Sequence, residues 1–206
     1  MHDIIFIGDS ITKGTYTNTG EECPNSIAMP TFADVICQEA GFSDMVNYGV
    51  NGISYSSLSP IQTQFSLSLQ CGGFDLAKNI VLAAGTNDFG TNVPLGVIED
   101  REDVSFCGAV EKVFRTLKNN NPHSVFFVLL PLNRWDKAVN DIGISLDEYR
   151  DVLRIKSKKF GFIVIDGKKI DISRRDITLD RVHPNNEGHR EIAKFILAEA
   201  KQFFKY

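Results

Sequence analysis

Five short apolar runs recur along this 206-residue chain, and segments with helical spacing lie between them. The runs are rich in Val, Ile, Leu and Phe and do not alternate with polar residues, which is typical of strands covered on both faces. They span residues 4–7, 45–50, 80–84, 125–130 and 162–165. Because strand and helix alternate, the order predicts an α/β fold in which a parallel sheet lies between two helix layers.

The segments between the runs carry apolar residues at the period of an amphipathic helix. Such spacing occurs over residues 106–117 and 192–203. A third segment, residues 146–159, follows the pattern Ser145-x-x-Glu148, a capping box that marks a helix start. We therefore expect helices over all three segments.

The composition is that of an ordinary globular protein, and we expect a single domain over residues 1–206. Hydrophobic residues make up 43% and charged residues 23% of the chain, with no biased tract. The formal net charge of -4 does not favour nucleic acid as a partner. No apolar stretch reaches the length of a bilayer span, and the first run is too short for a signal peptide. We expect a cytoplasmic protein, or a secreted one if a leader has been removed.

The four cysteines are widely spaced and form neither a C-x-x-C pair nor a cluster with histidine at zinc spacing. They are Cys23, Cys37, Cys71 and Cys107. We expect free, mostly buried thiols, with two disulfides as the alternative. We expect no metal site and no cofactor.

Polar residues follow the apolar runs at the points where the predicted strands end. In a parallel sheet, ligands bind outside the carboxyl ends of the strands, so these residues should share one edge. After the successive runs come Gly8-Asp9-Ser10, Asn51-Gly52, Gly85-Thr86-Asn87-Asp88, Asn133-Arg134-Trp135 and, further on, Asp180-x-x-His183. The order therefore predicts a site assembled from several strand ends.

Ser10 is the candidate nucleophile, because a serine hydroxyl attacks an acyl carbon once a base accepts its proton. Histidine is the side chain best suited to that task at neutral pH. His2 and His123 precede strands and are expected at the opposite edge, while His189 lies in the last predicted helix. His183, in the irregular segment before that helix, is the stronger candidate base.

Asp180 stands three residues before His183, a spacing at which a local turn brings the carboxylate onto the imidazole. Such a carboxylate fixes the tautomer of the ring and stabilises the imidazolium that forms. Asp176 and Asp166 are the alternatives for this role. The sequence thus contains a serine, an aspartate and a histidine in a pattern suited to acyl transfer.

Acyl transfer also needs hydrogen-bond donors directed at the developing oxyanion. The candidates are the Ser10 backbone amide, the Gly52 backbone amide and the Asn87 side chain, at three strand ends. Gly49 is the alternative to Gly52, which we prefer because it follows the strand directly. Asp9 adjoins Ser10 in sequence, so we expect its carboxylate to accept hydrogen bonds from loop amides rather than to serve as the catalytic acid.

Other catalytic patterns are missing from the sequence. No G-x-S-x-G elbow is present, which argues against an α/β-hydrolase. Neither G-x-G-x-x-G nor G-x-x-x-x-G-K-[ST] follows a run, which argues against dinucleotide and P-loop sites. The rival class is a flavodoxin-like binding module whose first loop, SITKGT, holds a phosphate. That interpretation leaves Asn87 and the pair of Asp180 and His183 unexplained.

Four separated blocks of the chain resemble those of the SGNH, or GDSL-type, serine hydrolases. Ser10 in FIGDSIT matches the nucleophile block, and Gly52 in VNYGVNGIS matches the glycine block. Asn87 in LAAGTNDF matches the asparagine block. Asp180 and His183 in DRVHPNNEGH match the D-x-x-H block. Together the blocks span nearly the whole chain.

The resemblance implies a three-layer α/β/α sandwich with a flavodoxin-like five-stranded parallel sheet. It implies hydrolysis of acyl esters through an acyl-enzyme on Ser10, with His183 as base and then acid, oriented by Asp180. The Ser10 and Gly52 amides and the Asn87 side chain would form the oxyanion hole.

The family covers acetyl esters of carbohydrates, lysophospholipids, short-chain lipids and thioesters, and loops determine the choice among them. Here the loops are residues 89–103 and 133–143, with Phe89, Arg134 and Trp135 as candidate pocket residues. An aromatic platform suits a sugar ring, and no long apolar insertion is present to act as a lipid lid. We expect a small acyl ester as the partner, with acetyl on a carbohydrate or similar polyol, and no stable membrane insertion. A lysophospholipase or thioesterase of the same family is the alternative.

Overall fold

The computed structural model describes residues 1–17, 26–61, 65–172, 178 and 180–206. A five-stranded parallel sheet forms its centre, with the strand order β4-β1-β5-β6-β7. The strands are β1 (His2–Gly8), β4 (Met45–Gly49), β5 (Ala77–Ala83), β6 (Val125–Leu129) and β7 (Ile163–Ile165). This strand order is that of flavodoxin-like folds, so the predicted sheet is confirmed.

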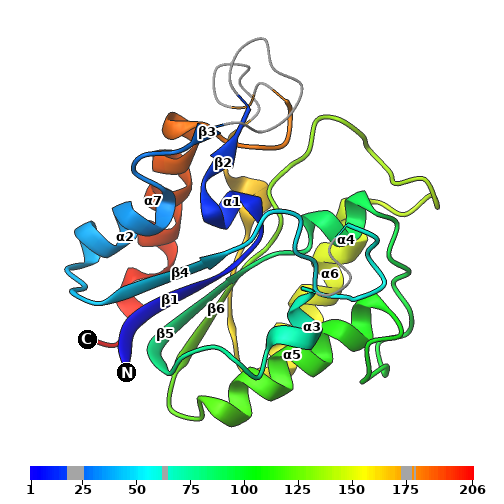
Figure 1. The fold of residues 1–206 in the computed structure, drawn as a ribbon, viewed down its shortest axis with the longest axis horizontal. Coiled ribbons are helices and arrows are strands. Elements are labelled where there is room, and N and C mark those ends of the chain that lie inside the picture. The colour runs from blue at the N-terminus through cyan, green and yellow to red at the C-terminus, as the bar shows by residue number, and fades with distance from the viewer. Residues whose placement is uncertain (18–25, 62–64, 173–177, 179) are drawn as a thin grey trace.

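Helices cover both faces of the sheet (Figure 1). On one face α2 (Phe32–Ala40) packs against α7 (Asn186–Ala200), and on the other α5 (Phe106–Asn120) packs against α6 (Leu146–Phe160). The shorter elements are α1 (Ser10–Lys13), α3 (Leu67–Gln70), α4 (Thr86–Gly90), the 3-10 turns η1 (Gly167–Lys169) and η2 (Lys201–Phe203), and a ribbon of β2 (Thr15–Tyr16) and β3 (Ser26–Ile27). The three layers agree with the expected α/β/α sandwich.

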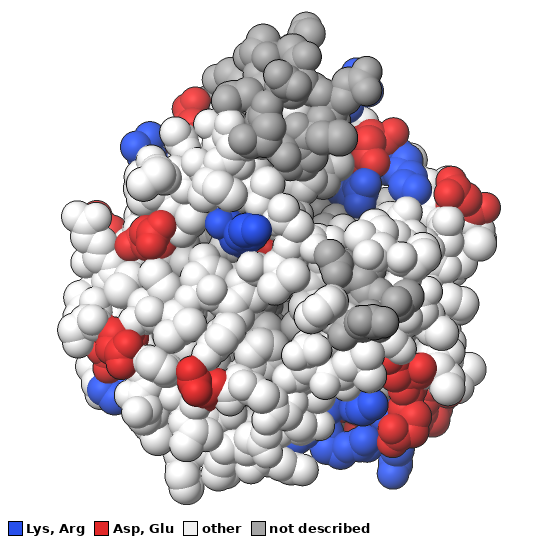
Figure 2. Space-filling model, viewed as in Figure 1, with Lys and Arg blue, Asp and Glu red and all other residues white. Residues whose placement is uncertain are grey.

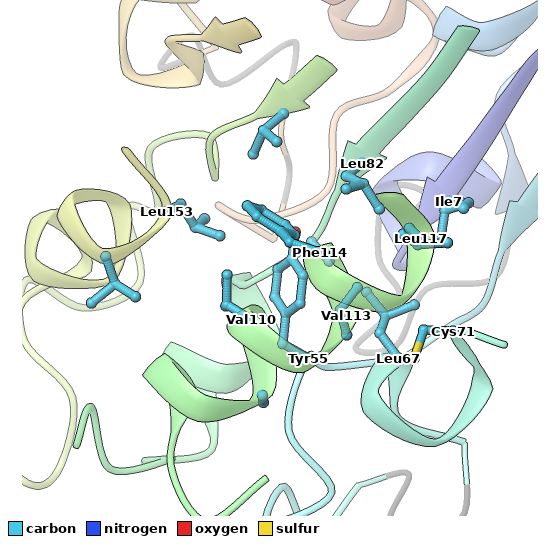
Figure 3. Close-up of a cluster of buried hydrophobic side chains, with 14 of the residues drawn as sticks. Ile7, Tyr55, Leu67, Cys71, Leu82, Val110, Val113, Phe114, Leu117 and Leu153 are labelled. Atoms are coloured by element: carbon cyan, nitrogen blue, oxygen red, sulfur yellow. The ribbon is translucent and has the colours of Figure 1, made fainter. Parts of the chain in front are cut away.

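Successive residues of β1 point to opposite faces of the sheet, and both faces are buried. Ile4 and Phe6 join the core beneath α2 and α7, while Ile5 and Ile7 join the core beneath α3, α5 and α6. Figure 3 shows part of the second core, where Ile7 and Leu82 from the sheet lie near side chains of α3 and α5. Burial on both faces explains why the apolar runs do not alternate with polar residues.

The strand boundaries agree with the predicted ones to within two residues, except at the start of β5. The prediction began at residue 80, but the strand begins at Ala77 and includes the polar Lys78 and Asn79. Asn79 is buried, and its Nδ2 donates to the carbonyl oxygens of Asp3 at 2.9 Å and Lys205 at 2.7 Å. A pattern of apolar residues cannot identify a strand position that is occupied by a buried, hydrogen-bonded polar side chain.

The three predicted helices are present. The capping box of Ser145 and Glu148 precedes α6, and Asn185 caps α7 by accepting hydrogen bonds from the backbone N–H groups of Glu187 and Gly188. Among the described residues, no helix is long and apolar enough to cross a membrane.

The described cysteines are free thiols, as expected. Cys71 and Cys107 are buried, and Cys37 is partly buried. Cys23 lies outside the described residues.

Both chain ends lie at the amino-terminal edge of the sheet (Figure 1). Met1 and Tyr206 line the same cavity of about 480 Å³, together with His123. His2 begins β1 at this edge. His2 and His123 therefore lie at the edge opposite the carboxyl ends of the strands, as predicted.

His189 joins α7 to the start of α2. Its buried ring stacks on Phe32 with 5.8 Å between ring centroids, and Nδ1 accepts a hydrogen bond from the Phe32 backbone N–H at 3.1 Å. Burial lowers the pKa of His189 to about 4. The neutral ring is therefore the folded form, and His189 serves the packing of two helices.

We expect His189 to make the free energy of unfolding decrease as the pH falls. The unfolded chain binds this proton near pH 6.5 and the folded chain only near pH 4. The stabilisation is therefore complete above about pH 6.5 and is lost towards pH 4, by up to about 3 kcal/mol. Urea unfolding of wild type and His189→Asn, which keeps a hydrogen-bond acceptor but does not titrate, should diverge across this range. The exposed His123→Asn is the control, and a pH-independent difference for His189→Asn would contradict the prediction.

Candidate active site

Three neighbouring strands end level with one another at the carboxyl edge of the sheet. Gly8 of β1 pairs with Gly49 of β4 and with Ala83 of β5. A Cβ atom at Gly8 would lie 2.2 Å from Thr12 Oγ1 of α1, and one at Gly49 would lie 2.2 Å from the Lys13 backbone nitrogen. The two glycines therefore allow α1 to pack directly on the ends of β1 and β4.

Asp9 is the single residue between β1 and α1. Its buried carboxylate caps the helix, with Oδ1 accepting a hydrogen bond from the Ile11 backbone N–H at 2.9 Å. Burial raises the pKa of Asp9 to about 6, although this hydrogen bond favours the ionised form. Asp9 therefore binds a backbone amide, as expected, but that amide belongs to α1, of which Ser10 is the first residue.

Ser10, His183 and Asp180 form one chain of hydrogen bonds. Ser10 Oγ lies 2.8 Å from His183 Nε2, and His183 Nδ1 lies 2.7 Å from Asp180 Oδ2. Asp180 Oδ1 accepts from the backbone N–H groups of Val182 at 2.9 Å and His183 at 2.7 Å. These two backbone contacts close the local turn between the aspartate and the histidine.

Asp180 is held as a carboxylate. Burial alone would raise the pKa of Asp180, but the hydrogen bonds from His183 and Val182 outweigh it and hold the pKa below its usual range. Of the two alternative aspartates, Asp166 caps η1, and Asp176 lies outside the described residues.

Thr17 is a further partner of this carboxylate. Its Oγ1 donates to Asp180 Oδ2 at 2.8 Å, the same oxygen that accepts from His183 Nδ1. Each oxygen of Asp180 thus accepts two hydrogen bonds. Thr17 is buried, and the sequence analysis missed it because no motif marks it and only the tertiary contact brings it to Asp180.

Gly52 lies in the turn after β4. Its φ is +75°, in the left-handed region that favours glycine. The preceding residue, Asn51, accepts a hydrogen bond from Thr15 Oγ1 at 2.7 Å. The alternative donor, the Gly49 backbone N–H, donates to Asn47 Oδ1 at 2.9 Å and is therefore already engaged.

Asn87 and Asp88 join the end of β5 to the segment after this turn. Asn87 Nδ2 donates to the Ile53 carbonyl oxygen at 2.8 Å, which uses one of its two hydrogens and leaves the other for a ligand. Asp88 accepts from the backbone N–H groups of Tyr55 at 2.9 Å and Ser56 at 3.0 Å. Burial raises the pKa of Asp88 to about 7. Asp88 has no predicted role, because in the sequence an aspartate next to the candidate oxyanion donor Asn87 resembles an ordinary turn residue.

Phe89 is a core residue, and its assignment to a substrate pocket is wrong. Its side chain is 0% exposed and contacts Tyr149 with 5.8 Å between ring centroids, because α4 turns it inward.

Arg134 lies over the Phe89 ring and donates from Nη1 to the Thr86 carbonyl oxygen at 3.0 Å. Its Nη2 pairs with Asp136 at 2.6 Å. Arg134 therefore holds the start of α4, and its charge is already paired.

Trp135 is the candidate pocket residue that remains at the surface, with 48% of it exposed. Its backbone N–H donates to the Arg181 carbonyl oxygen at 3.1 Å. Arg181 lies between Asp180 and His183 in the chain, so this contact holds the Trp135 loop beside the hydrogen-bonded chain. Of the three candidate pocket residues, Trp135 is the one whose side chain is free to meet a substrate.

A family model described as the GDSL-like lipase/acylhydrolase family matches residues 6–191 of this chain. Among solved structures, a protein from Lactobacillus plantarum is similar with a TM-score of 0.78 and 20% identity, over 98% of this chain and 97% of that one. The lipase/acylhydrolase from Enterococcus faecalis has a TM-score of 0.65 and 16% identity, over 100% and 98%. A member of the lipolytic protein G-D-S-L family from Veillonella parvula has a TM-score of 0.64 and 18% identity, over 97% and 98%. A search of curated proteins finds no match.

We expect Gly49→Ala to destabilise the protein by about 1–3 kcal/mol or more, because the added Cβ meets the Lys13 backbone at 2.2 Å. Gly72→Ala is the matched control, since no described atom lies within 4 Å of its Cβ position. That substitution should be neutral or stabilising by up to about 1 kcal/mol. Urea unfolding measures both changes. Equal unfolding free energies for the two variants would show that α1 does not depend on the close approach at Gly49.

Proposed function

The chain belongs to the GDSL-like lipase/acylhydrolase family, and we propose that it cleaves acyl esters through an acyl-enzyme on Ser10. Membership of this family makes the chain an ester hydrolase. The observation that carries the proposal is the hydrogen-bonded chain from Ser10 through His183 to Asp180, with distances of 2.8 and 2.7 Å. Nucleophilic catalysis by serine requires a base within hydrogen-bond reach and a third group that orients the base.

In the first half-reaction, Ser10 Oγ attacks the carbonyl carbon of the ester while its proton passes to His183 Nε2. Asp180 accepts a hydrogen bond from the N–H at His183 Nδ1 and, as a carboxylate, stabilises the imidazolium. The tetrahedral intermediate collapses when His183 gives its proton to the alcohol oxygen, the bond from the carbonyl carbon to that oxygen breaks, and the alcohol leaves. The acyl group then remains on Ser10 Oγ.

In the second half-reaction, a water molecule attacks the acyl carbon and gives its proton to His183 Nε2. The second tetrahedral intermediate collapses when His183 returns the proton to Ser10 Oγ. The carboxylic acid leaves, and the resting hydrogen-bonded chain forms again.

Three donors are available for the negative oxygen of the intermediates. The Ser10 N–H belongs to the first residue of α1 and so has no partner within the helix ladder. The Gly52 N–H lies in the turn after β4, and Asn87 keeps a second amide hydrogen. We assign these groups to the oxyanion hole, which supplies a large part of the stabilisation in acyl transfer.

We propose small acyl esters as substrates, beginning with acetyl, on a carbohydrate or similar polyol alcohol. The half-exposed Trp135 beside Arg181 supports this assignment, because an aromatic ring offers a face to a sugar. A lysophospholipase or thioesterase is the second candidate within the family. A flavodoxin-like binding module is not favoured, because the family is one of acylhydrolases.

A single domain over residues 1–206 is part of this proposal. The site draws Ser10 from the start of the chain and His183 from the segment before α7, near its end. The contact of 2.8 Å between Ser10 and His183 supports the proposal of one folded unit.

We expect Ser10→Ala to lower kcat for p-nitrophenyl acetate by at least about a thousandfold, because the nucleophile is lost. His183→Ala should cause a loss of similar size, since the serine then keeps its proton. His123→Ala, at the opposite edge, should stay within about twofold of wild type. Release of p-nitrophenolate measures the rate, and urea midpoints check that each variant is folded. Wild-type turnover by folded Ser10→Ala would exclude the proposed mechanism.

We expect Thr17→Val to lower kcat by about three- to tenfold with KM unchanged, because Asp180 loses one hydrogen bond worth about 0.5–1.5 kcal/mol. Thr17 is a positioning residue here, since it acts through Asp180. Thr17→Ser keeps the hydroxyl and should restore most of the rate. If the serine variant were as slow as the valine variant, the hydroxyl would not be the cause.

A further inference from the structure

A second hollow of the molecule lies beside the turn that carries Gly52. It is a cavity of about 230 Å³, and its wall includes Tyr48, Val50, Ile53, Phe65, Gly73 and Phe74. We call it the β4 pocket, because its wall begins at the carboxyl end of that strand. None of the steps described above uses it.

The wall of the β4 pocket is mostly apolar, with Gln70 as its polar member. The Tyr48 ring packs against Phe74 with 5.2 Å between centroids, and its hydroxyl is bonded to Asp75. Val50 is 38% exposed and Phe65 is 53% exposed, so both leave apolar surface open to water. The surface near the centre of the face in Figure 2 consists largely of residues other than Lys, Arg, Asp and Glu. An apolar ligand group would therefore cover surface that water now contacts.

The β4 pocket and the proposed oxyanion hole share one turn of the chain. Val50 and Ile53, which stand on either side of Gly52 in the sequence, belong to the pocket wall. The Ile53 carbonyl oxygen accepts the hydrogen bond from Asn87. A carbonyl oxygen held by Gly52 and Asn87 therefore lies next to the wall of the pocket.

The position of His183 decides which part of an ester points towards the β4 pocket. His183 must reach the alcohol oxygen, and it precedes α7, which packs on the α2 face of the sheet. Ile53 belongs to the core on the opposite face, beneath α5 and α6, and Tyr48 and Phe74 pack against that core. Because the alcohol and the acyl tail leave the carbonyl carbon in different directions, the acyl tail is the part directed away from His183.

We propose that the β4 pocket binds the alkyl tail of the acyl group, so that the preferred substrates are esters of straight-chain acids of about four to eight carbons. This inference rests on the proposed function and extends its acyl group beyond acetyl. The cavity of about 230 Å³ is smaller than the roughly 300–1,000 Å³ of pockets that enclose drug-sized ligands. It has room for roughly seven groups the size of a water molecule. Each methylene that it covers should raise kcat/KM by up to about fourfold.

Gly73→Leu tests the pocket by filling it. A Cβ at Gly73 meets no described atom closer than the Gln70 carbonyl oxygen at 3.6 Å, so the backbone accepts a side chain there. Gly72→Leu is the matched control. No described atom lies within 4 Å of the Cβ that the substitution adds, and Gly72 is not in the pocket wall. Phe65→Ala is a second variant, which removes part of the apolar wall.

The substrates are the p-nitrophenyl esters of acetate, butanoate, hexanoate and octanoate. For wild type we expect kcat/KM to rise at least tenfold from acetate to hexanoate. Gly73→Leu should abolish this rise and leave acetate within about twofold, while Gly72→Leu should behave as wild type. Phe65→Ala should reduce the rise and also leave acetate unchanged.

Two results would overturn the inference while the proposed function stands. One is wild-type hydrolysis of acetate, dependent on Ser10, with no gain for longer chains. The other is an equal loss for acetate and hexanoate in Gly73→Leu, which would show a general disturbance of the fold. Absence of hydrolysis for every ester would instead count against the proposed function itself.

Discussion

The strands β1, β4 and β5 end at the same height in the sheet, and the candidate site depends on this alignment. Gly8, Gly49 and Ala83 are paired side by side, so the residues that follow them emerge at one edge. The distance of 2.8 Å between Ser10 Oγ and His183 Nε2 is shorter than the rise of one strand residue, about 3.3 Å. A shift of β1 by a single residue would therefore separate the two groups. Sheet pairing and the close packing of α1 at Gly49 together determine where the serine hydroxyl lies.

Much of the fold could be predicted because both faces of the sheet are buried. Apolar runs without alternation marked all five strands, and the rule for strand ends brought Ser10, Asn87 and His183 to one edge. The contacts that the sequence analysis missed depend on tertiary structure. Thr17 meets Asp180 only in the folded chain, and Phe89 is buried because of the direction in which α4 turns. Neither local spacing nor residue type carries that information.

Three aspartates of the site region differ in their surroundings, and their pKa values differ accordingly. Asp9 and Asp88 are fully buried, and burial raises their pKa values to about 6 and about 7. Asp180 is only half buried and accepts four hydrogen bonds, so its pKa lies below the usual range. The aspartate nearest to Ser10 in sequence thus supports the backbone, whereas the one beside His183 stays charged. Adjacency in the sequence is a poor guide to the chemical role of a carboxylate.

The two chain ends lie side by side at the edge of the sheet opposite Ser10. Asn79 Nδ2 binds the carbonyl oxygens of Asp3 and Lys205, so one side chain holds both ends of the chain against the same strand. The strand that separates them from Ser10 is on the order of 20 Å long. A tether or a fused domain attached at either end would therefore lie at the edge of the sheet opposite Ser10. It would not obstruct a bulky substrate that approaches the edge where Ser10 lies.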